Sequence, residues 1–229
     1  MRVRQALSLA IDRQLVIDTV LQGQGIAAQG LYPPGLSAHN EDFKPFESDV
    51  EKAKALLAEA GYPDGIELTV RTDQNETENL VLNAIAATVA EAGITLNINS
   101  TEATVYTTDR TACTMEMGGI RWGMDYPDPE NMVVLLLPNA PTRANCGYGE
   151  VDVAPQITEL YKRAISLPLG EERDAVFSEI EKIAIENVLI LPVYNGATTP
   201  CEPAPGRSAD GQCWHHSLCL HNTPVISKG

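Results

Sequence analysis

Two alternating segments separated by a helical one constrain the fold of this chain most strongly. Residues 66–71 and 94–99 alternate apolar and polar side chains, which is the period of a half-buried strand. Residues 76–92 between them carry apolar side chains at helical spacing, and Gly93 ends the helix. Strands joined through a helix by short connections run parallel, with a right-handed crossover. The sequence therefore predicts an α/β fold.

The flanking segments continue the pattern of helices and strands. Residues 3–21 have apolar positions at helical spacing, which predicts one helix ended by Gly23. Ser48 and Glu51 match a capping box that opens a second helix, and Gly61 ends it. We further expect a helix packed on the sheet over 130–137, other helices over 101–110, 151–166 and 171–186, and strands over 112–120 and 188–194.

The most unusual composition lies in the stretch GGIRWGMDYPDPE, residues 118–130. Its prolines force an irregular loop after the expected strand. Trp122 and Tyr126 offer flat apolar faces, while Asp125 and Asp128 offer anionic acceptors, a combination suited to an amine or an extended polar ligand. Open α/β sheets bind ligands at the carboxyl ends of their strands, where this loop begins. The residues alone also allow a proline-bounded turn with a buried tryptophan and solvated acids.

Charge limits the classes of partner. The 229 residues carry 31 acids and 16 bases, for a formal net charge of −15. This balance argues against nucleic acid and anionic membrane surfaces, and it favours cationic over anionic ligands. It is also what solubility alone would select. No apolar run approaches the roughly 20 residues that span a bilayer, so no membrane insertion is expected. The residues after Met1 are expected to begin a helix rather than a signal peptide.

A catalytic function has little support in the residues. The chain lacks a nucleophile elbow, a phosphate-binding Gly-Lys-Ser/Thr loop and a His-Glu-x-x-His helix. His39 stands alone in a loop and is expected to be solvated. Asp125 and Asp128 lack neighbours that would separate their pKa values into an acid and a base. We therefore predict a binding protein rather than an enzyme, with no cofactor.

The last segment, 197–229, differs from the rest because its prolines and glycines break any regular element. It holds three of the five cysteines and three of the four histidines, Cys201, Cys213, Cys219, His215, His216 and His221. Their spacing fits no standard zinc module, so we predict an irregular or out-of-frame tail and no metal site; a zinc-dependent hydrolase is the concrete alternative. Cys113 and Cys146 could form a disulfide in an oxidising compartment.

Four motifs resemble, in the same order, those of bacterial extracellular solute-binding proteins of family 5, the peptide-, nickel- and oligosaccharide-binding subunits of ABC importers. The motifs are VRQALSLAIDR at 3–13, YPPG at 32–35, EKAKALLAEAGYPDG at 51–65 and WGMDYPDP at 122–129. The resemblance implies a type II periplasmic-binding-protein-like lobe with a mixed, mostly parallel sheet flanked by helices. Residues 1–196 would form the second lobe, and 197–229 the atypical tail.

The resemblance also implies a peptide ligand, an ABC permease partner and a periplasmic or extracellular location. In peptide-binding relatives an aspartate at the position of Asp125 pairs with the peptide α-ammonium, and Trp122 would wall the pocket. We predict Asp125, Trp122, Gly119, Arg121 and Tyr126 as ligand-binding residues. A nickel- or oligosaccharide-binding relative is an alternative, and Asp125 could instead cap the helix that follows.

The family closes its ligand between two lobes, and its chains are much longer than this one. The resemblance therefore implies a truncated form that carries half of a site, or a remnant without function. A lobe separated from its partner exposes strand edges and an apolar cleft face, which favours marginal stability or oligomerisation.

Overall fold

The computed structural model describes residues 1–43, 47–112, 114–137, 151–196 and 217–220. Its main sheet has five strands in the order β3-β2-β4-β7-β5. Their bounds are β2 Ile66–Asp73, β3 Ile94–Thr101, β4 Met117–Ile120, β5 Ile190–Pro192 and β7 Ser217–Leu220. β2 pairs in parallel with β3 and β4, whereas β7 is antiparallel to both of its neighbours. The sheet is therefore mixed, with only β7 reversed among the described strands.

The predicted strand-helix-strand unit is confirmed. β2 and β3 are joined by α4 (Glu76–Ala90) and pair in register from Ile66 opposite Ile94 onward. The turns that precede the two strands touch, since a Cβ added to Gly65 would meet the carbonyl group of Gly93. Gly65 also has a φ of 99°, a left-handed conformation that favours glycine. The register of the parallel pair is thus set where the strands begin.

The prediction of one helix over 3–21 is wrong, because two helices form, α1 (Arg2–Ala10) and α2 (Arg13–Val20). Ile11 between them is extended, and the Asp12 side chain accepts a hydrogen bond from the Leu15 N–H, as an N-cap does. The buried Arg13 guanidinium donates to the carbonyls of Pro192 at 2.9 Å and Ser8 at 3.1 Å. A contact with a strand distant in sequence therefore accompanies the break.

The helix predicted from the capping box at 48–51 is α3, and it begins one residue later than expected. Asp49 is the N-cap of α3 (Val50–Glu59), and its carboxylate accepts from the Lys52 N–H at 2.9 Å. Ser48 instead donates its hydroxyl proton to the Leu9 carbonyl at 3.2 Å. α4 and the N-terminal helices cover a core that includes the sheet residues Leu68, Val70 and Leu96.

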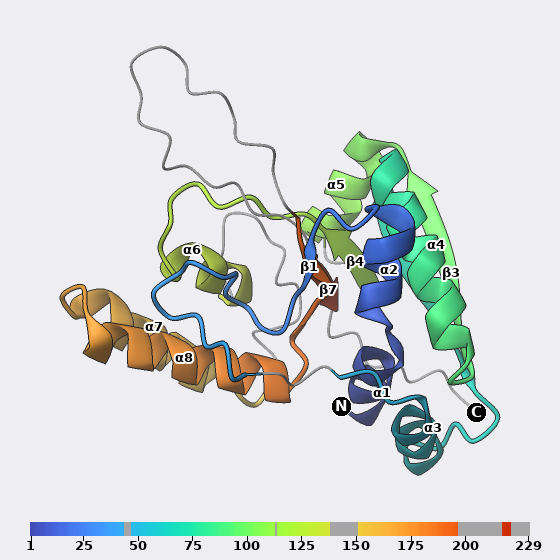
Figure 1. Ribbon diagram of the computed structural model, residues 1–229, viewed down its shortest axis with the longest axis horizontal. Helices are drawn as coiled ribbons and strands as arrows, with labels where there is room; N and C mark the ends of the chain where they lie inside the picture. Colours follow the sequence, from blue (N-terminus) through green and yellow to red (C-terminus); the bar gives the residue numbers. More distant parts are fainter. Residues whose placement is uncertain (44–46, 113, 138–150, 197–216, 221–229) are drawn as a thin grey trace.

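A second core lies among the later helices, which Figure 1 shows on the opposite side of the molecule from α1–α4. It joins α6 (Glu130–Val133) and a 3-10 turn (Val134–Leu136) to α7 (Ala154–Ser166) and α8 (Glu171–Glu186). The helices predicted over 151–166 and 171–186 are confirmed. The prediction of a single helix over 130–137 packed on the sheet is wrong, since these two short elements pack chiefly against α7 and α8.

The segment 188–194 is buried throughout, as expected, but its strand divides in two. β5 joins the main sheet, and β6 (Tyr194–Asn195) pairs with β1 (Ile26–Ala27) in a separate antiparallel sheet. The expected helix over 101–110 is α5 (Ala103–Ala112), and the strand expected over 112–120 is the shorter β4.

The prediction of an irregular tail is wrong for Ser217–Leu220, because β7 lies between β4 and β5. Cys201, Cys213, His215, His216 and His221 lie outside the described residues, as do Cys113 and Cys146 of the suggested disulfide. Among the helices that the structure describes, none is both long and apolar enough to cross a membrane.

Asp49 and Ser48 at the start of α3 should contribute differently to stability, because only Asp49 caps the helix. Asp49→Ala should lower the free energy of unfolding by about 1 kcal/mol, because the Lys52 N–H loses its acceptor. Ser48→Ala is the matched control and should cost less than about 0.5 kcal/mol, because its bond lies at an exposed site. Urea denaturation followed by circular dichroism measures both, and equal losses would contradict Asp49 as the cap.

Candidate functional site

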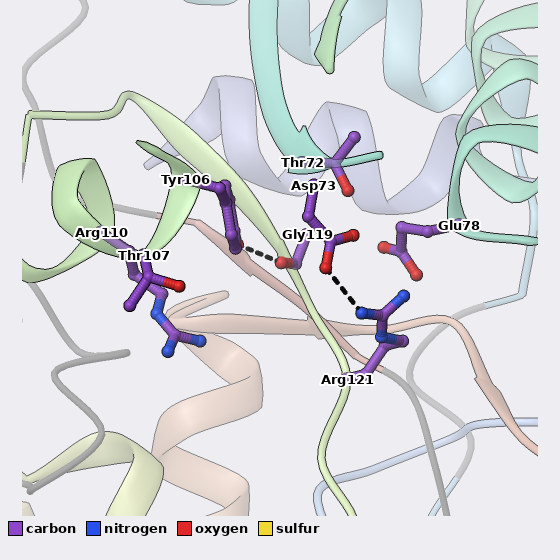
Figure 2. Close-up of a pocket in the computed structure, with 8 residues that line it drawn as sticks. All are labelled: Thr72, Asp73, Glu78, Tyr106, Thr107, Arg110, Gly119 and Arg121. Carbon is purple, nitrogen blue, oxygen red and sulfur yellow. Dashed lines mark hydrogen bonds and ion pairs between the residues drawn. The ribbon is translucent and has the colours of Figure 1, made fainter. Parts of the chain in front are cut away.

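A polar pocket of about 160 Å³ lies where β2 and β4 end side by side. Figure 2 shows its lining residues, which come from the end of β2, the first turn of α4, α5, and the end of β4. They are Thr72, Asp73, Glu78, Tyr106, Thr107, Arg110, Gly119 and Arg121. The pocket thus occupies the carboxyl edge of the parallel strands, the usual ligand position in open α/β sheets.

Two interactions across the pocket fix its walls. The Arg121 guanidinium binds the Asp73 carboxylate at 2.7 Å and so links the chain after β4 to the end of β2. The Tyr106 hydroxyl donates to the Gly119 carbonyl and ties α5 to β4. The Arg110 guanidinium lies 5.8 Å from the centre of the Tyr106 ring, a cation–π distance. The wall is therefore braced on both sides of β4.

Glu78 forms a buried acidic part of this pocket. Glu78 is only 6% exposed, and a Cβ added to Gly119 would lie 2.5 Å from the Glu78 Oε1 atom. Burial raises the pKa of Glu78 to about 7, with the Arg121 charge opposing the rise and the Asp73 charge adding to it. The absence of a side chain at Gly119 therefore gives the Glu78 carboxyl its place behind β4.

The five predicted ligand-binding residues fall into two groups. Gly119 and Arg121 line the polar pocket, whereas Trp122, Asp125 and Tyr126 continue along the loop and are not among its lining residues. Tyr126 is 44% exposed. The role of these five residues in ligand binding stays a prediction.

Asn131 in α6 anchors the ligand loop, which we define as residues 121–129. The half-buried Trp122 indole N–H donates at 3.1 Å to both the side-chain and main-chain oxygens of Asn131. The Asp125 backbone N–H donates to the same Asn131 Oδ1 at 3.3 Å. The Asp125 side chain is exposed, and among the described residues no hydrogen bond or ion pair involves its carboxylate. Asn131 therefore holds the loop in place, while the Asp125 side chain is exposed to solvent.

Asp128, rather than Asp125, supports the helix that follows the loop. Its Oδ1 accepts from the Glu130 N–H at 2.9 Å, so the alternative role of Asp125 as that cap is wrong. Both Asp128 oxygens also accept from the Arg173 guanidinium, each at 2.9 Å. Burial favours a higher pKa for Asp128, but these bonds from Arg173 and Glu130 together hold its pKa below the usual value.

Sequence reasoning missed Arg173 and Asn131. Arg173 is 6% exposed, lies 4.7 Å above the Phe177 ring, and shares the buried face of α8 with Ile180. An arginine on the apolar face of the predicted helix 171–186 was the available signal. Asn131 carried no such signal, because a lone asparagine near a helix start reads as a surface residue.

The same face of α8 holds a second loop. Glu181 accepts from the N–H groups of Leu31 at 2.7 Å and Tyr32 at 3.1 Å. Burial raises the pKa of Glu181 to about 7, although the two hydrogen bonds from Tyr32 and Leu31 lower it. The buried Tyr32 hydroxyl donates to the Phe177 carbonyl at 2.9 Å. Tyr32, the first residue of the YPPG motif, therefore joins this segment to α8.

Two residues considered for catalysis, His39 and Asp128, each have a defined structural partner. His39 is half-buried, and its Nδ1 lies 2.8 Å from the Tyr32 carbonyl oxygen, so the expected solvated histidine is wrong in detail. Asp128 is committed to Arg173 and does not form an acid–base pair with Asp125. No group of three or more His, Cys, Asp or Glu side chains in the described part of the chain could hold a metal ion.

The close approach of the Glu78 carboxylate to Gly119 in β4 predicts that substitutions at these two positions have coupled effects on stability. Gly119→Ala should destabilise the protein by about 1 kcal/mol, because the new Cβ would displace the Glu78 carboxylate, which is buried but ends a flexible side chain. In a Glu78→Ala background the space is open, so the same substitution should cost much less. Urea denaturation of the four variants of this cycle measures the coupling, and additive costs would contradict it.

The raised pKa of Glu78 predicts how stability depends on pH. Its pKa rises from 4.5 to about 7 on folding, so between these values the folded chain binds more protons than the unfolded one. This contribution is complete at low pH and is lost as pH rises toward 7, by up to about 1.4 kcal/mol per pH unit. Between about pH 5 and about pH 8 the wild type should lose more stability than Glu78→Gln. Parallel urea-denaturation profiles for the two proteins would contradict the assignment.

Comparison with known proteins agrees with this architecture. Heme-binding protein A of Haemophilus influenzae is 30% identical over 201 residues, which cover 84% of this chain and 36% of that protein. The dipeptide-binding protein of Escherichia coli is 32% identical over 157 residues, 65% of this chain and 29% of that protein. The chain thus spans about a third of the length of these relatives.

Solved structures show the same fold. The periplasmic binding protein DppA from Helicobacter pylori, in complex with the peptide STSA, superposes with a TM-score of 0.74 at 24% identity. The match covers 96% of this chain and 40% of that one. The expected type II periplasmic-binding-protein fold is therefore confirmed. The model for the middle region of bacterial extracellular solute-binding proteins, family 5, matches residues 1–143. With more than half of its length matched, the chain belongs to the bacterial extracellular solute-binding proteins of family 5.

Proposed function

We propose that this chain forms one face of a peptide-binding site in the substrate-binding component of an ABC importer. The partner would be the membrane permease, and the location the periplasm or the cell exterior. The site would bind its ligand without chemical change. Two relatives support a peptide ligand by their names, the dipeptide-binding proteins of Escherichia coli and Pseudomonas aeruginosa, at 32% and 30% identity.

The observation that carries this proposal is the outward-facing Asp125 carboxylate on a fixed backbone. The Asn131 side chain holds the Asp125 backbone, and Arg173 holds the end of the loop through Asp128. A carboxylate presented in this way can receive an ammonium group without first reordering, which lowers the entropic cost of binding. An ammonium–carboxylate pair is also a charge-assisted hydrogen bond, stronger than a neutral one.

The neighbouring groups suit the rest of a short peptide. Trp122 precedes Asp125 in the loop and offers an aromatic face beside the ligand. Tyr126 is 44% exposed and extends that aromatic surface. Gly119 and Arg121 open the polar pocket at the end of β4, where main-chain and side-chain polar groups are available to a peptide backbone. The net charge of −15 favours the approach of the cationic end of the ligand.

A titration by nuclear magnetic resonance tests this function at the loop itself. Addition of a free dipeptide such as Ala-Phe should shift the indole N–H signal of Trp122. An N-acetylated dipeptide, which lacks the ammonium, should bind at least about tenfold more weakly, because the charge-assisted bond is lost. Asp125→Ala should lose the same preference for the free amine.

Asp64→Ala is the matched control. Asp64 is an exposed acid in the turn before β2, at the opposite end of that strand from the pocket residue Asp73. This variant has the same change in charge and should respond to dipeptide as the wild type does. Equal responses to the free and N-acetylated peptides, or no response at millimolar peptide, would contradict the proposed function.

A further inference from the structure

We propose that Asn131 is a positioning residue, whose buried side-chain oxygen sets Trp122 and Asp125 in the geometry that binds ligand. The role in binding rests on the proposed function, but the positioning itself can be measured without a ligand. Asn131 lies outside the ligand loop, in the first turn of α6. It would act on the proposed ligand only through Trp122 and Asp125.

A single atom, Asn131 Oδ1, accepts two hydrogen bonds from the ligand loop. Asn131 is 3% exposed, and its Oδ1 accepts from the Trp122 indole N–H at 3.1 Å and the Asp125 backbone N–H at 3.3 Å. A carbonyl oxygen has two lone pairs, so both are used here. Because the two donors share one acceptor, the Trp122 ring and the Asp125 backbone cannot shift independently while both bonds remain.

Asn131 is itself held in a rigid frame. Its backbone N–H donates to the Asp128 carbonyl at 3.0 Å. Asp128 is bound through both oxygens by the buried Arg173 of α8. On the other side, the Glu130 carboxylate accepts from the Tyr161 hydroxyl of α7 at 2.8 Å. The shared acceptor is therefore fixed relative to two long helices, and the loop takes its position from them.

Packing alone does not account for an asparagine here. The next residues, Met132, Val133 and Leu135, are apolar members of the second core, and an apolar side chain at 131 would be buried at less cost. A buried amide is favourable only where its hydrogen bonds are made. The two donors that the side-chain oxygen satisfies both belong to predicted ligand-binding residues, Trp122 and Asp125, which points to positioning.

The test compares Asn131→Leu with Asn131→Asp. Leucine branches at the same atom but has no side-chain acceptor, whereas aspartate keeps an oxygen at the same place. In Asn131→Leu the Asp125 backbone N–H loses its acceptor and should exchange with solvent at least about tenfold faster. The Trp122 indole N–H keeps the main-chain oxygen of residue 131, so its exchange should rise by a smaller factor. Affinity for the dipeptide Ala-Phe should fall about tenfold. Asn131→Asp should restore most of both properties. Trp122→Phe assigns the indole signal, because the chain has a second tryptophan.

The outcomes separate this inference from the proposed function. If the wild type shows no amine-dependent dipeptide binding, the proposed function fails, while exchange of the Asp125 N–H still decides whether the Asn131 side chain positions the loop. If the wild type binds and Asn131→Leu matches it in exchange and affinity, the positioning role is overturned. Should Asn131→Leu unfold, Trp122→Phe tests the same bond from the donor side. Because Trp122 is itself a predicted ligand contact, the readout in that variant is the Asp125 backbone N–H, which shares the acceptor. Wild-type exchange of this N–H would overturn the coupling, and faster exchange would support it.

Discussion

The ion pair between the buried Arg173 and the half-buried Asp128 is the interaction on which the arrangement of the ligand loop depends. Two parallel N–H···O bonds of 2.9 Å join a guanidinium in α8 to a carboxylate 45 residues earlier in the chain. The Arg173 side chain is only 7% exposed, so this charge has lost most of its water and would be costly without its partner. The bidentate geometry also fixes the direction of the loop, which a single contact would not do.

α8 extends this role to a second segment of the chain. Arg173 and Glu181 lie on its buried face, and each binds a loop rather than another helix. Arg173 holds the end of the ligand loop, and Glu181 holds the backbone at Leu31 and Tyr32. Because the helix gives both side chains a rigid base, two segments distant in sequence are fastened to one element. The apolar residues between them, Phe177 and Ile180, supply the core that makes this base stable.

The polar pocket has a different physical origin. It exists because β2 and β4 are parallel neighbours that end at the same edge of the sheet, which brings Asp73 and Arg121 within 2.7 Å. Glu78 then occupies the space behind Gly119 and carries a pKa raised to about 7 by burial. The pocket and the ligand loop adjoin at Arg121, so the end of β4 positions both. This continuity makes the two features parts of one candidate site.

The sequence by itself determined the elements whose signals are local. The alternation of residues 66–71 and 94–99 and the helix between them were enough for β2, α4 and β3, because side-chain period and short connections decide such a unit. The motif at 122–129 likewise indicated an irregular loop that carries Asp125, whose role in binding stays a prediction. Only the tertiary structure decided the break at Ile11, the place of β7 within the sheet and the roles of Asn131 and Arg173. The contact of Arg13 with Pro192, the pairing of β7 and the bond of Arg173 to Asp128 join partners distant in the chain, whereas Asn131 meets donors six and nine residues before it. Buried polar side chains are chosen by what they meet after folding, which no local pattern records.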